Sequence, residues 1–119
     1  DALSDRLSMK RVRALMAEGA IEIAPLAFMR GRTLNDAFVV IDEAQNCTYG
    51  QLKVLLTRLG WHATMVVTGD PNQSDLLPEL SGLGPVADKF DALANIAVVR
   101  LKDVDIVRHP LVAEMLGVL

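Results

Sequence analysis

The stretch FVVIDEAQN, residues 38–46, decides how the rest of the chain is interpreted. Its first four residues are apolar and mostly β-branched, which is typical of a strand covered on both faces in a parallel sheet. Two carboxylates, Asp42 and Glu43, follow directly. Acidic side chains at the end of a buried segment are usually paired, bound to a metal or engaged in chemistry. This strand end is therefore the first candidate site.

A second segment of the same form, ATMVVTGD at residues 63–70, also runs from an apolar strand into polar residues. In parallel α/β sheets, ligands bind beyond the carboxyl ends of the strands. If the two strands are neighbours, residues 42–45 and 68–73 meet over one edge of the sheet. Either polar segment alone is also compatible with an ordinary solvated turn. A glutamine at a similar offset in each, Gln45 and Gln73, favours a shared site.

The remaining pattern alternates helices with strands, which predicts an α/β fold: a three-layer sandwich with a mainly parallel sheet. Expected helices are residues 3–19 with a stop at Gly19, 51–60 with Gly60 as the cap, 84–93, and 109–119 with Pro110 in the first turn. Thr48-x-x-Gln51 is a capping-box pattern before the second of these. Further strands are expected at residues 20–24 and 96–101, and loops at 25–36 and 71–84.

Composition limits the class of protein. The 119 residues suffice for one domain with a core, and the net charge of −3 argues against a generally basic surface that coats nucleic acid. Aromatic residues make up 4% of the chain, too few for base-stacking platforms. The single cysteine, Cys47, has no internal disulfide partner and suits a reducing compartment. No signal peptide and no apolar run near a membrane-spanning length is present, so we expect a cytoplasmic protein without membrane association.

The chemistry of the first polar segment has the form of a Walker B motif. In such a motif the first acid, here Asp42, holds Mg²⁺ directly or through water, and the second, here Glu43, orients or deprotonates the attacking water. Gln45 and Gln73 are neutral and both donate and accept hydrogen bonds. They therefore suit contact with a terminal phosphate without adding negative charge beside ATP.

Four segments resemble a known family. They are PLAFMRGRTLNDAFVVIDEAQN at residues 25–46, LTRLGWHATMVVTGDPNQSDL at 56–76, SGL at 81–83 and DIVRHPLV at 105–112. Together they look like the C-terminal two-thirds of a PhoH-like ATPase domain. The resemblance implies a P-loop NTPase with a RecA-like core, related to superfamily 1 helicases. It further implies ATP and Mg²⁺ as cofactors, ATP hydrolysis, a link to RNA metabolism, and assembly into a homo-oligomeric ring.

The resemblance also implies roles for individual residues. Asp42 and Glu43 resemble the Walker B acids. Four residues resemble the helicase-type third motif, whose glutamine contacts the terminal phosphate: Thr68, Gly69, Asp70 and Gln73. Arg108 is expected to reach a phosphate, within the subunit or across an interface. Arg30 and Arg32 flank Gly31 in a loop, where they contact RNA phosphate or a neighbouring subunit, or remain solvated or paired with Asp36.

Two departures from the family pattern matter. Asn72 stands where the family usually has threonine, which leaves Gln73 in place. A Walker A loop, G-x-x-x-x-G-K-[ST], is absent, because none of the four lysines follows a glycine. We therefore expect residues 1–119 to be the C-terminal portion of a single PhoH-like ATPase domain without its P-loop, and to bind nucleotide weakly on its own.

Two other functions stay open from the residues alone. One is a degenerate RecA-like scaffold that binds RNA or a partner protein without catalysis. The other is a metal-dependent nuclease that uses Asp42, Glu43 and Asp70, for which few acids converge. The sequence of the region upstream distinguishes the ATPase from the scaffold, and cleavage of RNA without ATP would indicate the nuclease.

Overall fold

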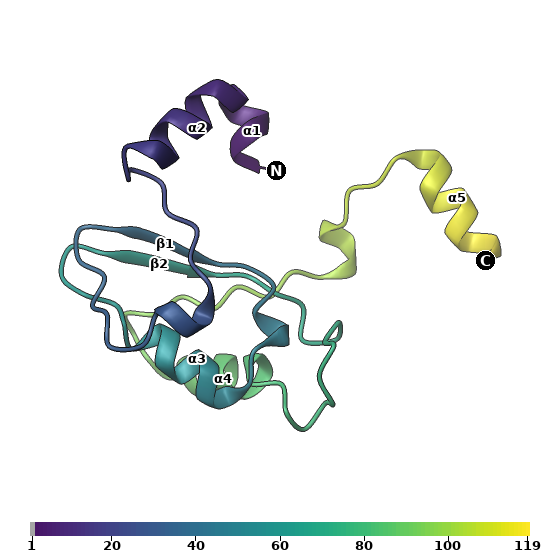
Figure 1. Cartoon of the computed structure of the whole chain (residues 1–119). Helices are drawn as coiled ribbons and strands as arrows, with labels where there is room; N and C mark the ends of the chain where they lie inside the picture. The colour runs from purple at the N-terminus through teal and green to yellow at the C-terminus, as the bar shows by residue number, and fades with distance from the viewer. Residues whose placement is uncertain (1) are drawn as a thin grey trace. The chain divides into compact units, whose positions relative to one another are not determined.

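The computed structural model describes residues 2–119, which divide into two compact units, the first ending at Gly84 and the second being Pro85–Leu119. The first unit is a mixed α/β unit built around a parallel pair of strands (Figure 1). Its helices and strands are α1 (Ala2–Arg6), α2 (Met9–Ala17), β1 (Phe38–Ile41), α3 (Tyr49–Leu56) and β2 (Thr64–Val67), with short 3₁₀ turns at Leu26–Phe28 and Ala44–Asn46.

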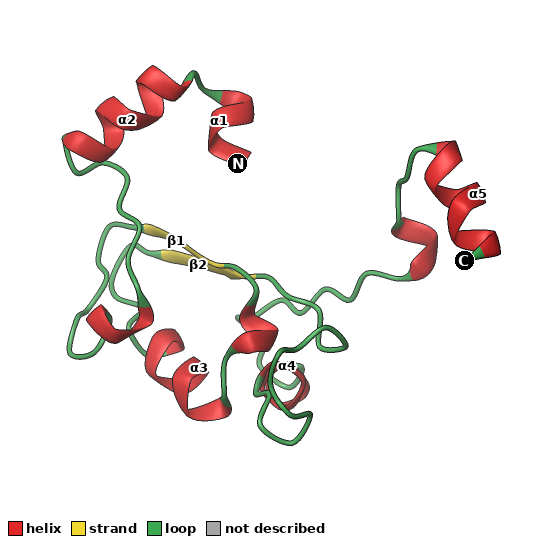
Figure 2. Cartoon of the chain, turned by 45° about the vertical axis from the view of Figure 1, so that its right-hand side comes forward, coloured by secondary structure: helices red, strands yellow, loops and turns green. Residues whose placement is uncertain are grey.

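The strands β1 and β2 pair in parallel, in a register that runs from Phe38 opposite Thr64 to Ile41 opposite Val67. Helix α3 connects them and lies on one face of the pair (Figure 2). A parallel pair needs such a crossover, because the chain must return to the starting edge before the second strand begins. The prediction that these two segments are neighbouring strands is confirmed.

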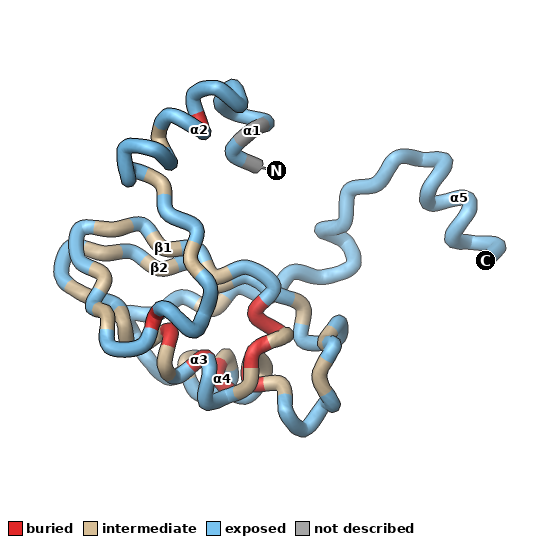
Figure 3. The backbone as a smooth tube through the Cα atoms, in the orientation of Figure 1, coloured by how far each residue is buried: buried red, intermediate tan, exposed pale blue. Residues whose placement is uncertain are grey.

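Helix α3 begins as its sequence predicts. Thr48 Oγ1 accepts from the Gln51 backbone N–H at 3.2 Å, and the Gln51 side chain accepts from the Thr48 N–H at 2.9 Å, which completes the capping box. Leu52 and Leu55 then face inward and are buried (Figure 3). The capping box therefore fixes the N-cap of the crossover helix, Thr48, two residues after the 3₁₀ turn at Ala44–Asn46.

The expectation that the apolar strands are covered on both faces is wrong. Val39, Ile41, Met65 and Val67 are half-buried, whereas Phe38, Val40 and Val66 on the other face are exposed, Phe38 by 71%. A continuous apolar run has the same sequence in both situations, so the pattern alone does not report how many faces are covered.

Two expected strands do not form. Residues 20–24 and 96–101 are outside any strand, and the sheet of the described residues contains β1 and β2. Apolar, β-branched composition makes a segment suitable for a strand, but the strand exists only where a neighbouring edge supplies the hydrogen bonds. The α/β class is therefore confirmed, and the structure gives one parallel pair in place of the larger sheet of a sandwich.

The ends of two expected helices also differ. The helix predicted over residues 3–19 is broken into α1 and α2, because Ser8 acts as an N-cap whose Oγ accepts from the Arg11 N–H at 3.1 Å. The stop at Gly19 is confirmed by its φ of 81°. Helix α3 ends at Leu56, before Gly60. Gly60 instead passes so close to Leu34 and Asn35 that a Cβ there would overlap both.

The second unit contains α5 (Pro110–Val118) and a 3₁₀ turn at Asp103–Asp105, and α4 (Leu83–Phe90) crosses into it from the first. Arg100 lies 2.8 Å from Asp91 and 3.2 Å from Asp88, and it holds the extended segment before the 3₁₀ turn against the end of α4. Helix α5 starts where predicted, with His109 Nδ1 accepting from the Leu111 N–H at 3.1 Å. No helix among residues 2–119 has the length and apolar character needed to cross a bilayer.

Candidate functional site

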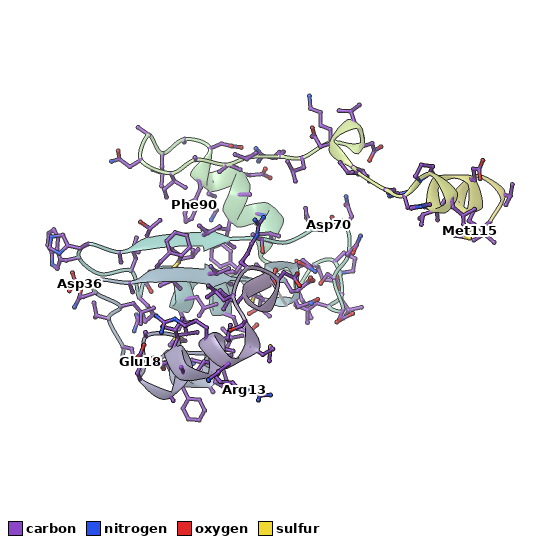
Figure 4. All side chains as sticks on the ribbon, turned by 90° about the horizontal axis from the view of Figure 1, so that it is seen from above. Arg13, Glu18, Asp36, Asp70, Phe90 and Met115 are labelled. Carbon is purple, nitrogen blue, oxygen red and sulfur yellow. The ribbon has the colours of Figure 1, made fainter. Side chains whose placement is uncertain are left out.

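The polar segments that follow β1 and β2 meet at one edge of the sheet. The strand pairing continues past both strands, through the Thr68 N–H to Ile41 O at 2.9 Å and the Ala44 N–H to Thr68 O at 2.9 Å. Thr68 Oγ1 then donates to Asp42 Oδ1 at 2.7 Å. Figure 4 shows Asp70 at this end of the pair and Asp36 at the opposite end. Asp42 and Thr68, two of the residues that the sequence singled out, are therefore in direct contact.

Asp42 is exposed and held in one orientation. Its Oδ1 accepts from the Thr68 hydroxyl and, at 2.9 Å, from the Glu43 N–H. Both of the described hydrogen bonds to this carboxylate end on Oδ1, so Oδ2 is the oxygen that can face a cation. A carboxylate with one fixed and one available oxygen suits Mg²⁺, which takes one or two protein carboxylates and completes its shell with water and phosphate oxygens.

Glu43 has a left-handed backbone, with φ of 53° and ψ of 40°. This conformation is uncommon for a residue with a Cβ and costs on the order of 1–2 kcal/mol. The turn redirects the chain from β1 into the 3₁₀ turn and leaves the exposed Glu43 side chain at the sheet edge. Strained backbone of this kind is concentrated at functional positions.

In the part of the chain that the structure describes, Gln45 is the buried polar residue, with 2% of its surface exposed. Its Nε2 donates to Glu43 Oε2 at 2.5 Å, and its Oε1 accepts from the Asp70 N–H at 3.1 Å. Its backbone oxygen accepts from Ser74 Oγ at 2.8 Å and from Ser81 Oγ at 2.9 Å. The residue expected to contact nucleotide is thus placed inside the turn, between the two polar segments.

The loop after β2 is ordered by hydrogen bonds to its own backbone. Asp70 Oδ1 accepts from the Asn72 N–H at 2.9 Å, and Asp70 O accepts from the Gln73 N–H at 3.1 Å. Asn72, which departs from the family pattern, therefore belongs to this turn through its backbone N–H. The next residue, Gln73, is exposed. Asp75 N–H donates to Asn46 Oδ1 at 2.9 Å, which ties the loop to the first polar segment.

Two glycines permit this close packing. A Cβ on Gly69 would lie 2.6 Å from Gln45 Oε1 and 3.1 Å from Ala44 N. A Cβ on Gly82 would overlap the backbone of Tyr49 and lie 2.7 Å from Thr48 C. Gly69 was predicted as a nucleotide contact, and the structure shows what its missing side chain makes possible. Gly82 lies in the SGL segment, whose residues have no role predicted from sequence.

Sequence reasoning missed the residues that lock the two segments together. They are small or polar residues close to the predicted motifs: Asn46, Ser74, Ser81 and Gly82. Their only sequence feature is proximity to the motifs, because serine, asparagine and glycine are equally common in ordinary loops. The partners of each are far away in the chain, so the link becomes visible only in the folded structure.

The arginines predicted as site residues differ in their contacts. Arg32 forms a two-point ion pair with Glu22, at 2.9 and 3.2 Å, which lowers the pKa of Glu22 chiefly through the hydrogen bond and secondly through the charge of Arg32. The expected alternative partner, Asp36, lies instead 3.3 Å from His62 Nδ1. Arg30 is exposed in the first unit, and Arg108 is exposed in the second.

The described carboxylates, within residues 2–119, do not cluster into a site with several metal ligands. Among residues 2–119, no group of three or more His, Cys, Asp or Glu side chains is placed to hold a metal ion. A nuclease centre formed by Asp42, Glu43 and Asp70 therefore receives no support from the structure. A single carboxylate such as Asp42 is compatible with a Mg²⁺ whose remaining ligands are phosphate oxygens and water.

Comparison with known proteins gives one consistent family. The model of the family described as "PhoH-like protein" matches residues 1–119. The chain is 49% identical over 117 residues to the PhoH-like protein of Bacillus subtilis (strain 168), covering 98% of the chain and 37% of that relative. It is 51% identical over 116 residues to the PhoH-like protein of Mycobacterium tuberculosis (strain ATCC 25618 / H37Rv), covering 97% of the chain and 33% of that relative. To Protein PhoH of Escherichia coli (strain K12) it is 46% identical over 94 residues, 78% of the chain and 27% of that relative. The chain spans between a quarter and two-fifths of the length of these relatives.

Proposed function

The chain belongs to the PhoH-like protein family, and on that premise we propose that it supplies the acidic half of a Mg²⁺-dependent ATP-hydrolysing site. One observation carries the proposal. The ends of β1 and β2 lie side by side, and Thr68 Oγ1 fixes the Asp42 carboxylate at 2.7 Å on their common edge. An acid held at the carboxyl end of a parallel strand is in the place where α/β folds bind ligands.

Four residues carry the proposed chemistry of this site. Asp42 holds the cation with the oxygen that Thr68 leaves available. A bound Mg²⁺ neutralises charge on the triphosphate. Glu43, exposed at the edge, accepts a proton from the attacking water. Gln73 contributes a neutral donor for the terminal phosphate. Arg108 is the cation proposed to stabilise transferred charge, from the same subunit or a neighbouring one.

The partners of the whole protein are part of the same proposal. We propose action on RNA and assembly into a ring. Residues 1–119 carry no Walker A pattern, so the proposed site requires a phosphate cradle that these residues do not supply. Arg30, exposed in the loop before β1, is the proposed contact to RNA phosphate or to a neighbouring subunit. Arg32 forms an ion pair with Glu22, so its guanidinium is less available for that contact.

The test is Glu43→Gln in the full-length protein. The substitution keeps shape and hydrogen-bonding capacity but removes the base, so we expect ATP binding to persist and hydrolysis to fall by about 10²- to 10⁴-fold. Glu79→Gln is the matched control, because it makes the same chemical change at an exposed residue of the loop between β2 and α4 that has no proposed role. Unchanged turnover in Glu43→Gln removes Glu43 from the mechanism. Absence of any ATPase activity in the wild type, with RNA binding retained, would favour the non-catalytic scaffold.

A further inference from the structure

We propose that Gln45 is a positioning residue that fixes the Glu43 carboxylate and ties it to the loop at residues 70–76. This inference rests on the proposed function, since Glu43 is the proposed base. It replaces the expectation that Gln45 itself senses a phosphate. The two polar segments would then respond to a bound nucleotide as one unit.

Both ends of the Gln45 carboxamide are engaged in hydrogen bonds. Nε2 donates to Glu43 Oε2 at 2.5 Å, and Oε1 accepts from the Asp70 N–H at 3.1 Å. A side chain that is 2% exposed and engaged at both ends has little capacity left for a ligand. A buried amide with both partners satisfied holds its neighbours in place.

The two hydrogen-bond partners of the Gln45 side chain require a donor at one end and an acceptor at the other. Glu43 offers an acceptor and the Asp70 N–H offers a donor, so the bridging group must donate at one end and accept at the other. A carboxamide of this length does so in one orientation only. The flipped orientation would set two acceptors against each other at Glu43 and two donors at Asp70. Neither a carboxylate nor an apolar side chain can satisfy both.

Gln45 is itself held in place by hydrogen bonds to its backbone from two other residues. Its backbone oxygen accepts from Ser74 Oγ and Ser81 Oγ, which belong to separate parts of the loop between β2 and α4. Gly69 leaves the space that Oε1 occupies, since a Cβ there would lie 2.6 Å away. The anchor for Glu43 is therefore rigid, whereas Glu43 is exposed and would otherwise sample several rotamers.

Two shape-conserving substitutions in the full-length protein separate the contacts. Gln45→Met removes both hydrogen bonds. Gln45→Glu keeps an acceptor for the Asp70 N–H but places a second carboxylate against Glu43. Gln51→Met is the matched control, since Gln51 also bonds a backbone N–H on the same connection but has no contact with Glu43. Amide hydrogen exchange of residues 70–76 and the steady-state constants for ATP are measured in each.

For Gln45→Met we expect faster exchange in residues 70–76 and a fall in kcat of about 10- to 100-fold with little change in KM, because the base is displaced while substrate binding is retained. For Gln45→Glu we expect exchange in residues 70–76 to stay protected, because the acceptor for the Asp70 N–H is kept, and kcat to fall, because the new carboxylate repels that of Glu43. Gln51→Met should leave kcat near the wild-type value.

Several outcomes overturn the inference. A wild-type kcat in either Gln45 variant, or a loss confined to KM, would contradict a positioning role. Unchanged exchange in Gln45→Met would contradict the tie to the loop. If Gln45→Met fails to fold, Gln45→Glu carries the test. A wild-type protein without ATPase activity would contradict the proposed function, while the exchange measurement would still decide the tie between Gln45 and the loop.

Discussion

Substituting Gly82 by alanine tests whether the two polar segments are held together by close backbone packing. A Cβ at this position would overlap the backbone of Tyr49 and lie 2.7 Å from Thr48 C. These neighbours are the first residues of α3, so they cannot rotate away as a flexible side chain would. Residues 81 and 82 must therefore separate from residues 47–49.

The loss in the free energy of unfolding caused by Gly82→Ala follows from the contacts that the substitution removes. Separation breaks the hydrogen bond from Gly82 N–H to Cys47 O at 2.9 Å and the one from Ser81 Oγ to Gln45 O at 2.9 Å. Two such bonds contribute roughly 1 kcal/mol each. Forcing a methyl group into a filled site adds about 1–3 kcal/mol. We expect Gly82→Ala to lower the free energy of unfolding by about 3–5 kcal/mol, a large share of the stability of a typical domain.

The assay is urea unfolding of the full-length protein, with Gly84→Ala as the matched control. A Cβ on Gly84 meets nothing within 4 Å, and Gly84 lies inside α4. Alanine is favoured over glycine in a helix interior by about 0.5–1 kcal/mol, but Gly84 is the second residue of α4 and precedes Pro85, which disfavours a Cβ there, so the control should be close to neutral. The two substitutions are the same chemical change two positions apart in the chain, and Gly82→Ala should be by far the more destabilising. If Gly82→Ala unfolds at the same urea concentration as Gly84→Ala, the proposed packing of these segments is incorrect.

Two further predictions concern the site edge and the ion pair beside it. Thr68→Val removes the hydroxyl that holds Asp42 Oδ1, so the apparent affinity for Mg²⁺ in ATP hydrolysis should fall by about tenfold or more, and an unchanged magnesium titration would contradict the role of Thr68. The hydrogen bond and charge of Arg32 lower the pKa of Glu22, so the stability they contribute is present at neutral pH and is lost as pH falls through the lowered pKa. Wild type and Arg32→Gln should therefore differ in stability at pH 7, and the difference should decline below the ordinary glutamate pKa of 4.5 and vanish once the pH is below the lowered pKa of Glu22, as measured by thermal unfolding. A difference that persists in stronger acid would point to packing rather than charge.

The local features of the chain were predictable because their causes are local. The capping box at Thr48 and Gln51 needs only four consecutive residues, and it formed as predicted. The stop at Gly19 and the start of α5 at Pro110 likewise depend on the conformational preferences of single residues. The pairing of β1 with β2 was also predictable, because two apolar strands joined by one short helix favour adjacent parallel strands.

The failures of prediction have a common cause. Residues 96–101 have the composition of a strand, yet whether they form one depends on an edge that their own sequence does not contain. The exposure of Phe38 has the same origin, since an apolar face requires a cover supplied by another part of a protein. Gly60 was assigned to helix capping because its neighbours are helical, but it serves the contact with Leu34 and Asn35 from a distant segment.

The sequence by itself determined the elements whose causes are local, and it identified which acids lie at the ends of the strands. It named Asp42, Glu43 and Gln45 together without distinguishing an acid at the surface from an amide inside the turn. Only the tertiary structure decided that Gln45 is buried between Glu43 and Asp70, because its second partner lies 25 residues further along the chain. Side-chain identity fixes which hydrogen bonds a residue can make, whereas the fold fixes which donors and acceptors lie within reach.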